Sequence, residues 1–309
     1  MKRITVRTLP DGSLKRLQPF HICMKGLETL VLCRSDEDYD AMVKVLCVSA
    51  WRCNVIIVIY TVVSNHCHVC ILAENQSSAD AYCIDIKKTY SMWFRKRYGE
   101  EKILHRVDMK ALCLDTDWYV RNALAYIVRN ILDNGGDINN YFWSGYSAMF
   151  VNKKCGDAHA GRAVSSLTKR EREQILHTGE KLSGVPWLIN HDGSLIPQSI
   201  CDHNYLEQAF ENDQAYFLRL IGSVNTSEMR YNLEERPYQI LPDSEFYKSV
   251  EETCQRYFSK GISEISLEQK NRLVPYIYHT RKTTIPQLSR VIGIPRETLA
   301  RMLAKRKSR

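Results

Sequence analysis

The sequence predicts an α+β fold, with helices packed on an antiparallel sheet, followed by a mainly helical C-terminal region. Up to about residue 132, segments alternate in the order strand, strand, helix, strand, strand, helix, extended segment, helix. Beyond residue 150 the patterns are mainly helical. A chain of 309 residues, 44% of them hydrophobic, can bury cores in two or three domains.

Local patterns predict each element of the first half. Strands are expected at 19–24, 27–32, 54–60 and 61–72, and a further extended segment at 103–114. Helices are expected at 36–51, 77–98 and 117–132. Ser35 and the acids after it mark the start of the first helix, Lys25-Gly26 is the first turn, and Gly99 ends the second helix. This order indicates a ferredoxin-like arrangement.

Composition narrows the class of protein. The first 19 residues form a basic arm, which we expect to be frayed and solvated, although it could follow phosphates. The 11 cysteines show no disulfide or zinc-finger spacing and are typical of reduced thiols in the cytoplasm. No secretory signal follows Met1, and the longest apolar run, 55–63, is too short for a membrane span. A net charge of +8 suits a polyanionic partner.

The strand at 61–72 carries two histidines separated by one residue. Side chains alternate along a strand, so His66 and His68 point to one face and Cys67 to the other. Two imidazoles on one face could hold a divalent metal, with further ligands from elsewhere in the chain. Without such a partner, histidines on a half-buried strand are usually packing residues.

A partner is present on the helix at 117–132. Tyr126 and Asn130 lie one turn apart, away from the main apolar face of the helix. That apolar face consists of Val120, Leu124, Ile127 and Ile131. A phenol and an amide oxygen so placed could reach the same metal-bound phosphate. From the sequence alone, Tyr119 and Tyr90 are equally eligible as the nucleophile.

Three motifs together resemble the single-tyrosine HUH transposases, and most closely the REP-associated tyrosine transposases. They are Asn65-His66-Cys67-His68-Val69, Tyr126-Ile127-Val128-Arg129-Asn130 and Tyr141-Phe142-Trp143-Ser144-Gly145-Tyr146. The resemblance covers about residues 15 to 150. It implies that His66, His68 and Asn130 hold Mg²⁺ or Mn²⁺ and that Tyr126 attacks DNA. Cys67 departs from the family's aliphatic residue, and Ile131 stands where the family commonly has proline.

The helix at 77–98 mixes cations with aromatic rings. The cations are Lys87, Lys88, Arg95, Lys96 and Arg97, and the rings are Tyr90, Trp93, Phe94 and Tyr98. This combination suits single-stranded DNA, since cations neutralise phosphates and rings stack on bases. The alternative is an amphipathic helix whose rings belong to the core and whose basic face is only solvated.

The C-terminal residues resemble helix-turn-helix domains that read duplex DNA. A capping box at Thr284 opens a short helix, and Gly293-Ile294-Pro295 makes a turn into a second helix. Residues 281–309 contain nine Lys or Arg and one acid, a net charge of +8. The expected DNA-binding residues here are Arg296, Arg301, Lys305 and Arg306. A helical hairpin with a solvated basic end is the alternative.

These observations define one functional hypothesis and its alternatives. We expect a transposase domain at 1–150, a helical region of unknown role at 151–262 and a DNA-binding domain at 263–309. The resemblance implies cleavage and rejoining of single-stranded hairpin DNA through a 5′-phosphotyrosine, with adjacent duplex DNA as a second partner. It favours a homodimer in the bacterial cytoplasm, associated with the nucleoid. The alternatives are a regulator that binds hairpins without cleaving them, and a nicking replication or mobilisation initiator.

Overall fold

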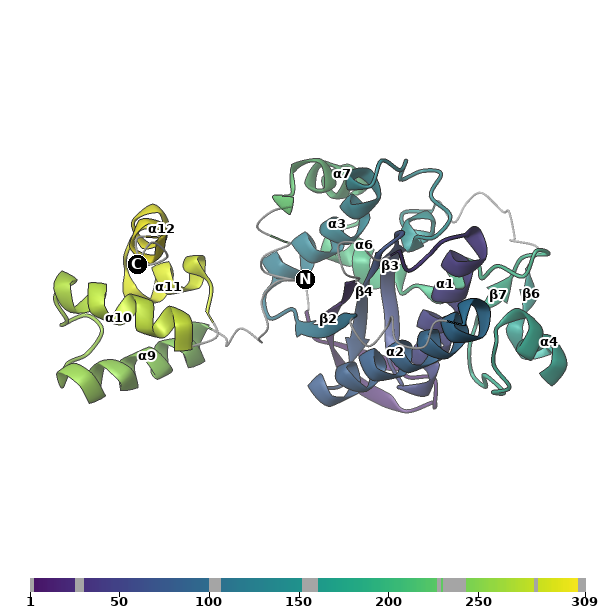
Figure 1. The fold of residues 1–309 in the computed structure, drawn as a ribbon, viewed down its shortest axis with the longest axis horizontal. Helices are drawn as coiled ribbons and strands as arrows, with labels where there is room; N and C mark the ends of the chain where they lie inside the picture. The colour runs from purple at the N-terminus through teal and green to yellow at the C-terminus, as the bar shows by residue number, and fades with distance from the viewer. Residues whose placement is uncertain are drawn as a thin grey trace. The chain divides into compact units, whose positions relative to one another are not determined.

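The structure, a computed structural model, consists of two compact units, Met1–Glu235 and Arg236–Arg309 (Figure 1). It describes residues 3–25, 31–99, 107–151, 161–226, 229, 243–280 and 283–304. The predicted α+β class is confirmed, because the first unit contains an antiparallel sheet with helices packed on it and the second unit is helical where it is described.

An antiparallel sheet of five strands forms the centre of the first unit. Its strands are β1 (Thr5–Thr8), β2 (Leu14–Lys25), β3 (Ile56–Val62), β4 (His66–Ala73) and β5 (Asp108–Cys113). The long strand β2 pairs with both β4 and β5, while its first residues pair with β1. β3 pairs with β4. The two histidine positions of β4 therefore lie inside the sheet, where their strand has neighbours on both sides.

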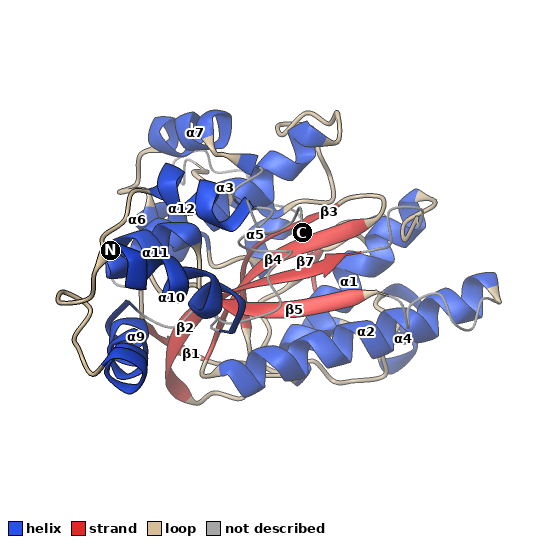
Figure 2. Cartoon of the chain, turned by 60° about the vertical axis from the view of Figure 1, so that its left-hand side comes forward, coloured by secondary structure: helices blue, strands red, loops and turns tan. Residues whose placement is uncertain are grey.

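Three helices cover the two faces of this sheet (Figure 2). They are α1 (Asp36–Arg52), α2 (Gln76–Tyr98) and α3 (Asp117–Asp133). α3 packs on β3 and β4 on the face that carries His66 and His68. α1 and α2 pack together on the other face, where the hydroxyl of Tyr82 donates to the carbonyl oxygen of Leu46. Figure 2 shows α3 above the strands and α2 below them.

The ends of these helices follow their capping residues. Ser35 forms a capping box with Asp38 at the start of α1. Asn75 caps α2 by accepting a hydrogen bond from the amide of Ser78. Gly99 ends α2 with φ of 70°, in the left-handed region that glycine adopts most easily. The helix boundaries predicted from the sequence are confirmed to within one or two residues.

Residues 161–226 pack into the core of the sheet unit. Their elements are β6 (Arg162–Ala163), η3 (Val164–Ser166), α4 (Lys169–Ile175), β7 (Leu188–Ile189), α5 (Pro197–Ile200), α6 (His203–Ala209) and α7 (Gln214–Ser223). The amide of Asp202 donates to the carbonyl oxygen of Ile57, and its carboxylate pairs with Arg7 at 2.7 Å. Buried side chains of this region continue the core formed by the sheet and its helices. The region expected as a separate helical part thus shares its core with the sheet.

The second unit has its own hydrophobic core. Its described helices are α9 (Asp243–Phe258), α10 (Leu267–Thr280), α11 (Ile285–Ile292) and α12 (Arg296–Ala304). Thr284 caps α11 by accepting from the amide of Gln287 at 2.9 Å, and Gly293 ends it with φ of 72°. Leu288 and Leu299 are both buried in this core. The tight turn expected between two short helices is therefore present.

One prediction about the N-terminus is wrong. Residues expected in a frayed arm form β1, which pairs with residues 14–17 of β2. The turn between them has a left-handed Gly12, and the carboxylate of Asp11 accepts from the amide of Ser13 at 2.9 Å. Asp-Gly is a turn signal that favours a hairpin, so local turn chemistry outweighed the basic charge. Most of the strand expected at 27–32 lies outside the described residues.

The strand expected at 54–60 is β3, which begins at Ile56 and continues to Val62. The strand expected at 61–72 is therefore wrong in its first residues, because β4 begins at His66. The extended segment expected at 103–114 contains β5. Among the described residues, no helix is long and apolar enough to cross a membrane.

Candidate active site

Strand β4 and helix α3 bring the four residues of the sequence hypothesis together. The ring centroids of His66 and His68 are 4.9 Å apart, and those of His68 and Tyr126 are 5.3 Å apart. The side-chain oxygen of Asn130 lies 3.2 Å from Nε2 of His66. Residues separated by about sixty positions in the sequence thus form one cluster between the sheet and α3.

The structure distinguishes between the tyrosines that the sequence left eligible. Tyr90 lies on α2, on the other side of the sheet, and its hydroxyl donates to the carbonyl oxygen of Leu32 at 2.7 Å. Tyr119 stands near the start of α3, with its ring against Trp118. Tyr126 is the tyrosine that contacts the histidines, and it is therefore the candidate nucleophile of this cluster.

His21 belongs to the same cluster and was missed in the sequence. It lies on β2 opposite Cys70, and its Nε2 is 3.1 Å from Nδ1 of His68, with the two rings stacked. Burial lowers the pKa of His21 to about 3, so this imidazole is neutral at physiological pH. A neutral His21 can accept a hydrogen bond from Nδ1 of His68. His68 then has an unprotonated Nε2, the form of imidazole nitrogen that can bind a metal.

Both ring nitrogens of His66 face amide oxygens. Nδ1 lies 2.7 Å from Oδ1 of Asn65, and Nε2 faces Oδ1 of Asn130. The orientation of Asn130 is set by its nitrogen, which donates to the carbonyl oxygen of Tyr126 at 2.7 Å. Because a neutral imidazole carries one N–H group, it can donate to one of these two oxygens only. Whichever of its two nitrogens carries the hydrogen, the other turns a lone pair toward an amide oxygen.

Two of the three candidate donor atoms lie at a spacing that suits a small divalent ion. Neighbouring ligands of an octahedral ion, with bonds of about 2.1 Å, lie about 3 Å apart. The 3.2 Å between Nε2 of His66 and Oδ1 of Asn130 is close to that spacing. Within the described part of the chain, no group of three or more His, Cys, Asp or Glu could hold a metal ion. Two imidazoles and one amide would thus leave several positions for water or phosphate oxygens.

The cluster is mostly shielded from solvent. His68 is fully buried, and Tyr126 and Asn130 are 1% and 4% exposed. His66, the first residue of β4, is partly exposed. A substrate would therefore meet His66 first, and the hydroxyl of Tyr126 must become accessible before it can react.

The cations predicted to bind DNA do not join this cluster. Lys87, Lys88, Arg95, Lys96 and Arg97 all lie on α2, which covers the opposite face of the sheet. Tyr90 and Phe94 are fully buried core residues, while Trp93 and Tyr98 are partly exposed. Arg97 pairs with Glu37 and, at 3.2 Å, with the buried Asp38. Two of the four rings thus belong fully to the core, and the other two pack against it from its edge.

In the second unit, Arg296 and Arg301 are exposed on α12. Lys305 and Arg306, also predicted to bind DNA, lie outside the described residues.

Comparisons with known proteins do not identify a relative. No family model, no curated protein and no solved structure matches the chain.

Proposed function

We propose that this protein cleaves and rejoins single-stranded DNA through a 5′-phosphotyrosine on Tyr126, as a transposase acting on hairpin DNA. The observation that carries the proposal is the approach of His66 and Asn130 to within 3.2 Å of each other beside His68 and Tyr126. An arrangement of this kind, with a phenol next to a metal-binding group, suits phosphoryl transfer.

In this proposal His66, His68 and Asn130 would hold Mg²⁺ or Mn²⁺, which when bound would polarise the scissile phosphate. The hydroxyl of Tyr126 loses its proton as its oxygen bonds to phosphorus. The bond from phosphorus to the 3′ oxygen breaks, and the departing 3′ oxygen takes up a proton, so the step is neutral in protons overall. The new phosphotyrosine bond conserves the energy of the broken phosphodiester bond, so a 3′-hydroxyl can attack it and rejoin the strand. His21 positions His68 through the contact between their ring nitrogens.

The second unit would supply a contact with duplex DNA. α11 and α12, joined by the turn at Gly293, have the order and lengths of a helix-turn-helix motif. Arg296 and Arg301 are exposed on the second of these helices. This assignment rests on the motif and on the basic charge of residues 281–309.

The burial of Tyr126 favours a second candidate function. A side chain that is 1% exposed cannot reach a phosphate without a local rearrangement. A protein that binds hairpin DNA without cutting it needs no such rearrangement. A nicking initiator of replication or mobilisation would share the chemistry of the first proposal and differ in its DNA substrate.

A covalent-adduct assay separates cleavage from binding alone. Wild-type protein and Tyr126→Phe are incubated with end-labelled hairpin oligonucleotides and Mn²⁺, then run on a denaturing gel. The hairpins are taken from palindromes that flank the gene. We expect a protease-sensitive adduct with the wild type and none with Tyr126→Phe. Tyr119→Phe, on the same helix, is the matched control and should retain the adduct. Hairpin binding without an adduct, both with Mn²⁺ and with Mg²⁺ in its place, would favour the regulator that binds hairpins without cleaving them.

A further inference from the structure

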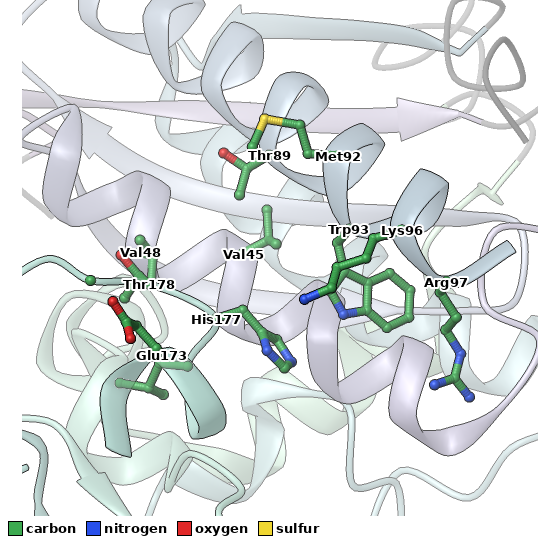
Figure 3. Close-up of a pocket in the computed structure, with 12 residues that line it drawn as sticks. Val45, Val48, Thr89, Met92, Trp93, Lys96, Arg97, Glu173, His177 and Thr178 are labelled. Carbon is green, nitrogen blue, oxygen red and sulfur yellow. The ribbon is translucent and has the colours of Figure 1, made fainter. Parts of the chain in front are cut away.

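A cavity of about 470 Å³ lies beside α1 and α2, the helices on the side of the sheet opposite the histidines (Figure 3). Its walls come from α1, from α2, and from the end of α4 with the residues that follow it. Val45, Val48 and Leu176 supply apolar surface, while Thr89, Thr178 and Glu173 supply polar groups. Volumes of a few hundred Å³ are typical of sites for small ligands.

One aromatic ring of α2 is turned to this cavity. Trp93 lines it, with its indole stacked on the buried Tyr90 at 5.6 Å between ring centroids. The ring of His177 stands 6.5 Å from the indole on the other wall, as Figure 3 shows. His177 has φ of 54°, an uncommon backbone conformation for a residue other than glycine. The cavity therefore presents two rings. Trp93 is supported from behind by the core residue Tyr90, and the guanidinium of Arg97 lies 5.6 Å from the centroid of its ring.

Among the described charged side chains around the cavity, one cation has no ion-pair partner, while Glu173 is paired with Lys169 at 3.8 Å. Burial lowers the pKa of His177, and the positive charges of Lys44 and Lys96 lower it further, partly opposed by Asp40. Lys44 is paired with Asp40, and Arg97 is paired with Glu37 and Asp38. Lys96 is exposed, and the described residues contain no carboxylate within ion-pair distance of it. Its charge is thus available at the edge of the cavity, beside Trp93.

We propose that this cavity binds one unpaired nucleotide of a DNA strand, with the base against Trp93 and His177 and the phosphate beside Lys96. Rings that stack on bases next to a cation are the usual elements of single-strand recognition. Glu173 and the two threonines offer hydrogen-bonding groups for the edge of the base. The inference rests on the proposed function, which makes single-stranded DNA the partner. It adds a contact on the side of the sheet away from Tyr126.

The test measures binding of fluorescent short oligothymidylate by the full chain carrying Tyr126→Phe, so that cleavage does not interfere. In this background Trp93→Ala should weaken binding about tenfold, because stacking of one base contributes about that much. Trp93→Phe should retain most of the affinity. Trp118→Ala, which removes a half-exposed indole on α3, is the control and should leave the affinity unchanged.

A pair of surface variants tests the phosphate contact with little risk to folding. Lys96→Ala should weaken binding several-fold more than Lys88→Ala, since Lys88 is exposed on the same helix and does not line the cavity. Equal losses from these two variants would overturn the proposal. An abasic strand that binds as tightly as oligothymidylate would also overturn it, by showing an anion site alone. If the wild-type protein forms no adduct while Trp93→Ala and Lys96→Ala lose binding as expected, the proposed cleavage would be refuted and this site would stand.

Discussion

The two faces of the sheet hold their polar groups in different ways. On the α3 face, His21, His66, His68 and Asn130 position one another through short contacts, mostly out of water. On the α2 face, the cations stand at the surface. A buried polar cluster needs a partner for each group, so its geometry is tightly specified. Exposed cations meet no such requirement, and their presence on a helix says little about where they act.

The first way to test this contrast is to remove one donor from the histidine cluster. His66→Ala deletes the nitrogen that faces Asn130, so we expect adduct formation to fall about 100-fold or more. Mn²⁺ should raise the melting temperature of the wild type and not that of His66→Ala, which gives a measurement independent of cleavage. His191→Ala, at an exposed loop position, is the matched control and should behave as the wild type. Equal Mn²⁺ stabilisation of wild type and His66→Ala would contradict the metal assignment.

The second test concerns the pH dependence of stability. Burial holds the pKa of His21 at about 3 in the folded protein, whereas an imidazole in an unfolded chain has a pKa of about 6.5. Between these values the unfolded chain binds one more proton at this position, so the free energy of unfolding falls as pH decreases. The contribution is at most about 1.4 kcal/mol per pH unit. His21→Gln should remove it and flatten the profile.

Urea unfolding at several pH values between 5 and about 7 measures this slope. All five tryptophans lie in the first unit, so their fluorescence reports on the unit that contains His21. His191→Gln should keep the wild-type slope, because that side chain is exposed. Parallel profiles for wild type and His21→Gln would show that His21 takes up its proton in the folded protein as well.

The histidine face also shows what the sequence could predict. α3 and the part of β4 from His66 onward were recognised because a helical apolar period and alternation are strong local signals. His21 was missed although its strand was expected. Its contact with His68 depends on the register between β2 and β4, which is set by pairing across distant parts of the chain. In the sequence, His21 could have been noticed as a histidine between the apolar residues Phe20 and Ile22 on an expected strand.

The cavity on the α2 face could not be predicted either. Its wall around Glu173 and His177 comes from a region whose elements are short, so hydrophobic periodicity gives little indication of where they pack. Helix α2 itself was predicted, but which of its rings face the core depends on how it lies against α1 and the sheet. Trp93 and Phe94 are neighbours in sequence, yet one lines a cavity and the other is fully buried.

The smallest expected effects concern Lys96 and Arg97, adjacent cations that the sequence alone does not distinguish. Arg97→Ala removes a partner of the buried Asp38 and should lower the free energy of unfolding by about 1 kcal/mol. Lys96→Ala should change it by less than about 0.5 kcal/mol. In DNA binding we expect the reverse order. Lys96→Ala should reduce the dependence of oligothymidylate affinity on salt by about 0.7 in the logarithmic slope, the value for one phosphate contact. If Arg97→Ala changed the salt slope and Lys96→Ala did not, the phosphate contact would belong to Arg97, and the ion pair with Asp38 would not keep that cation from DNA.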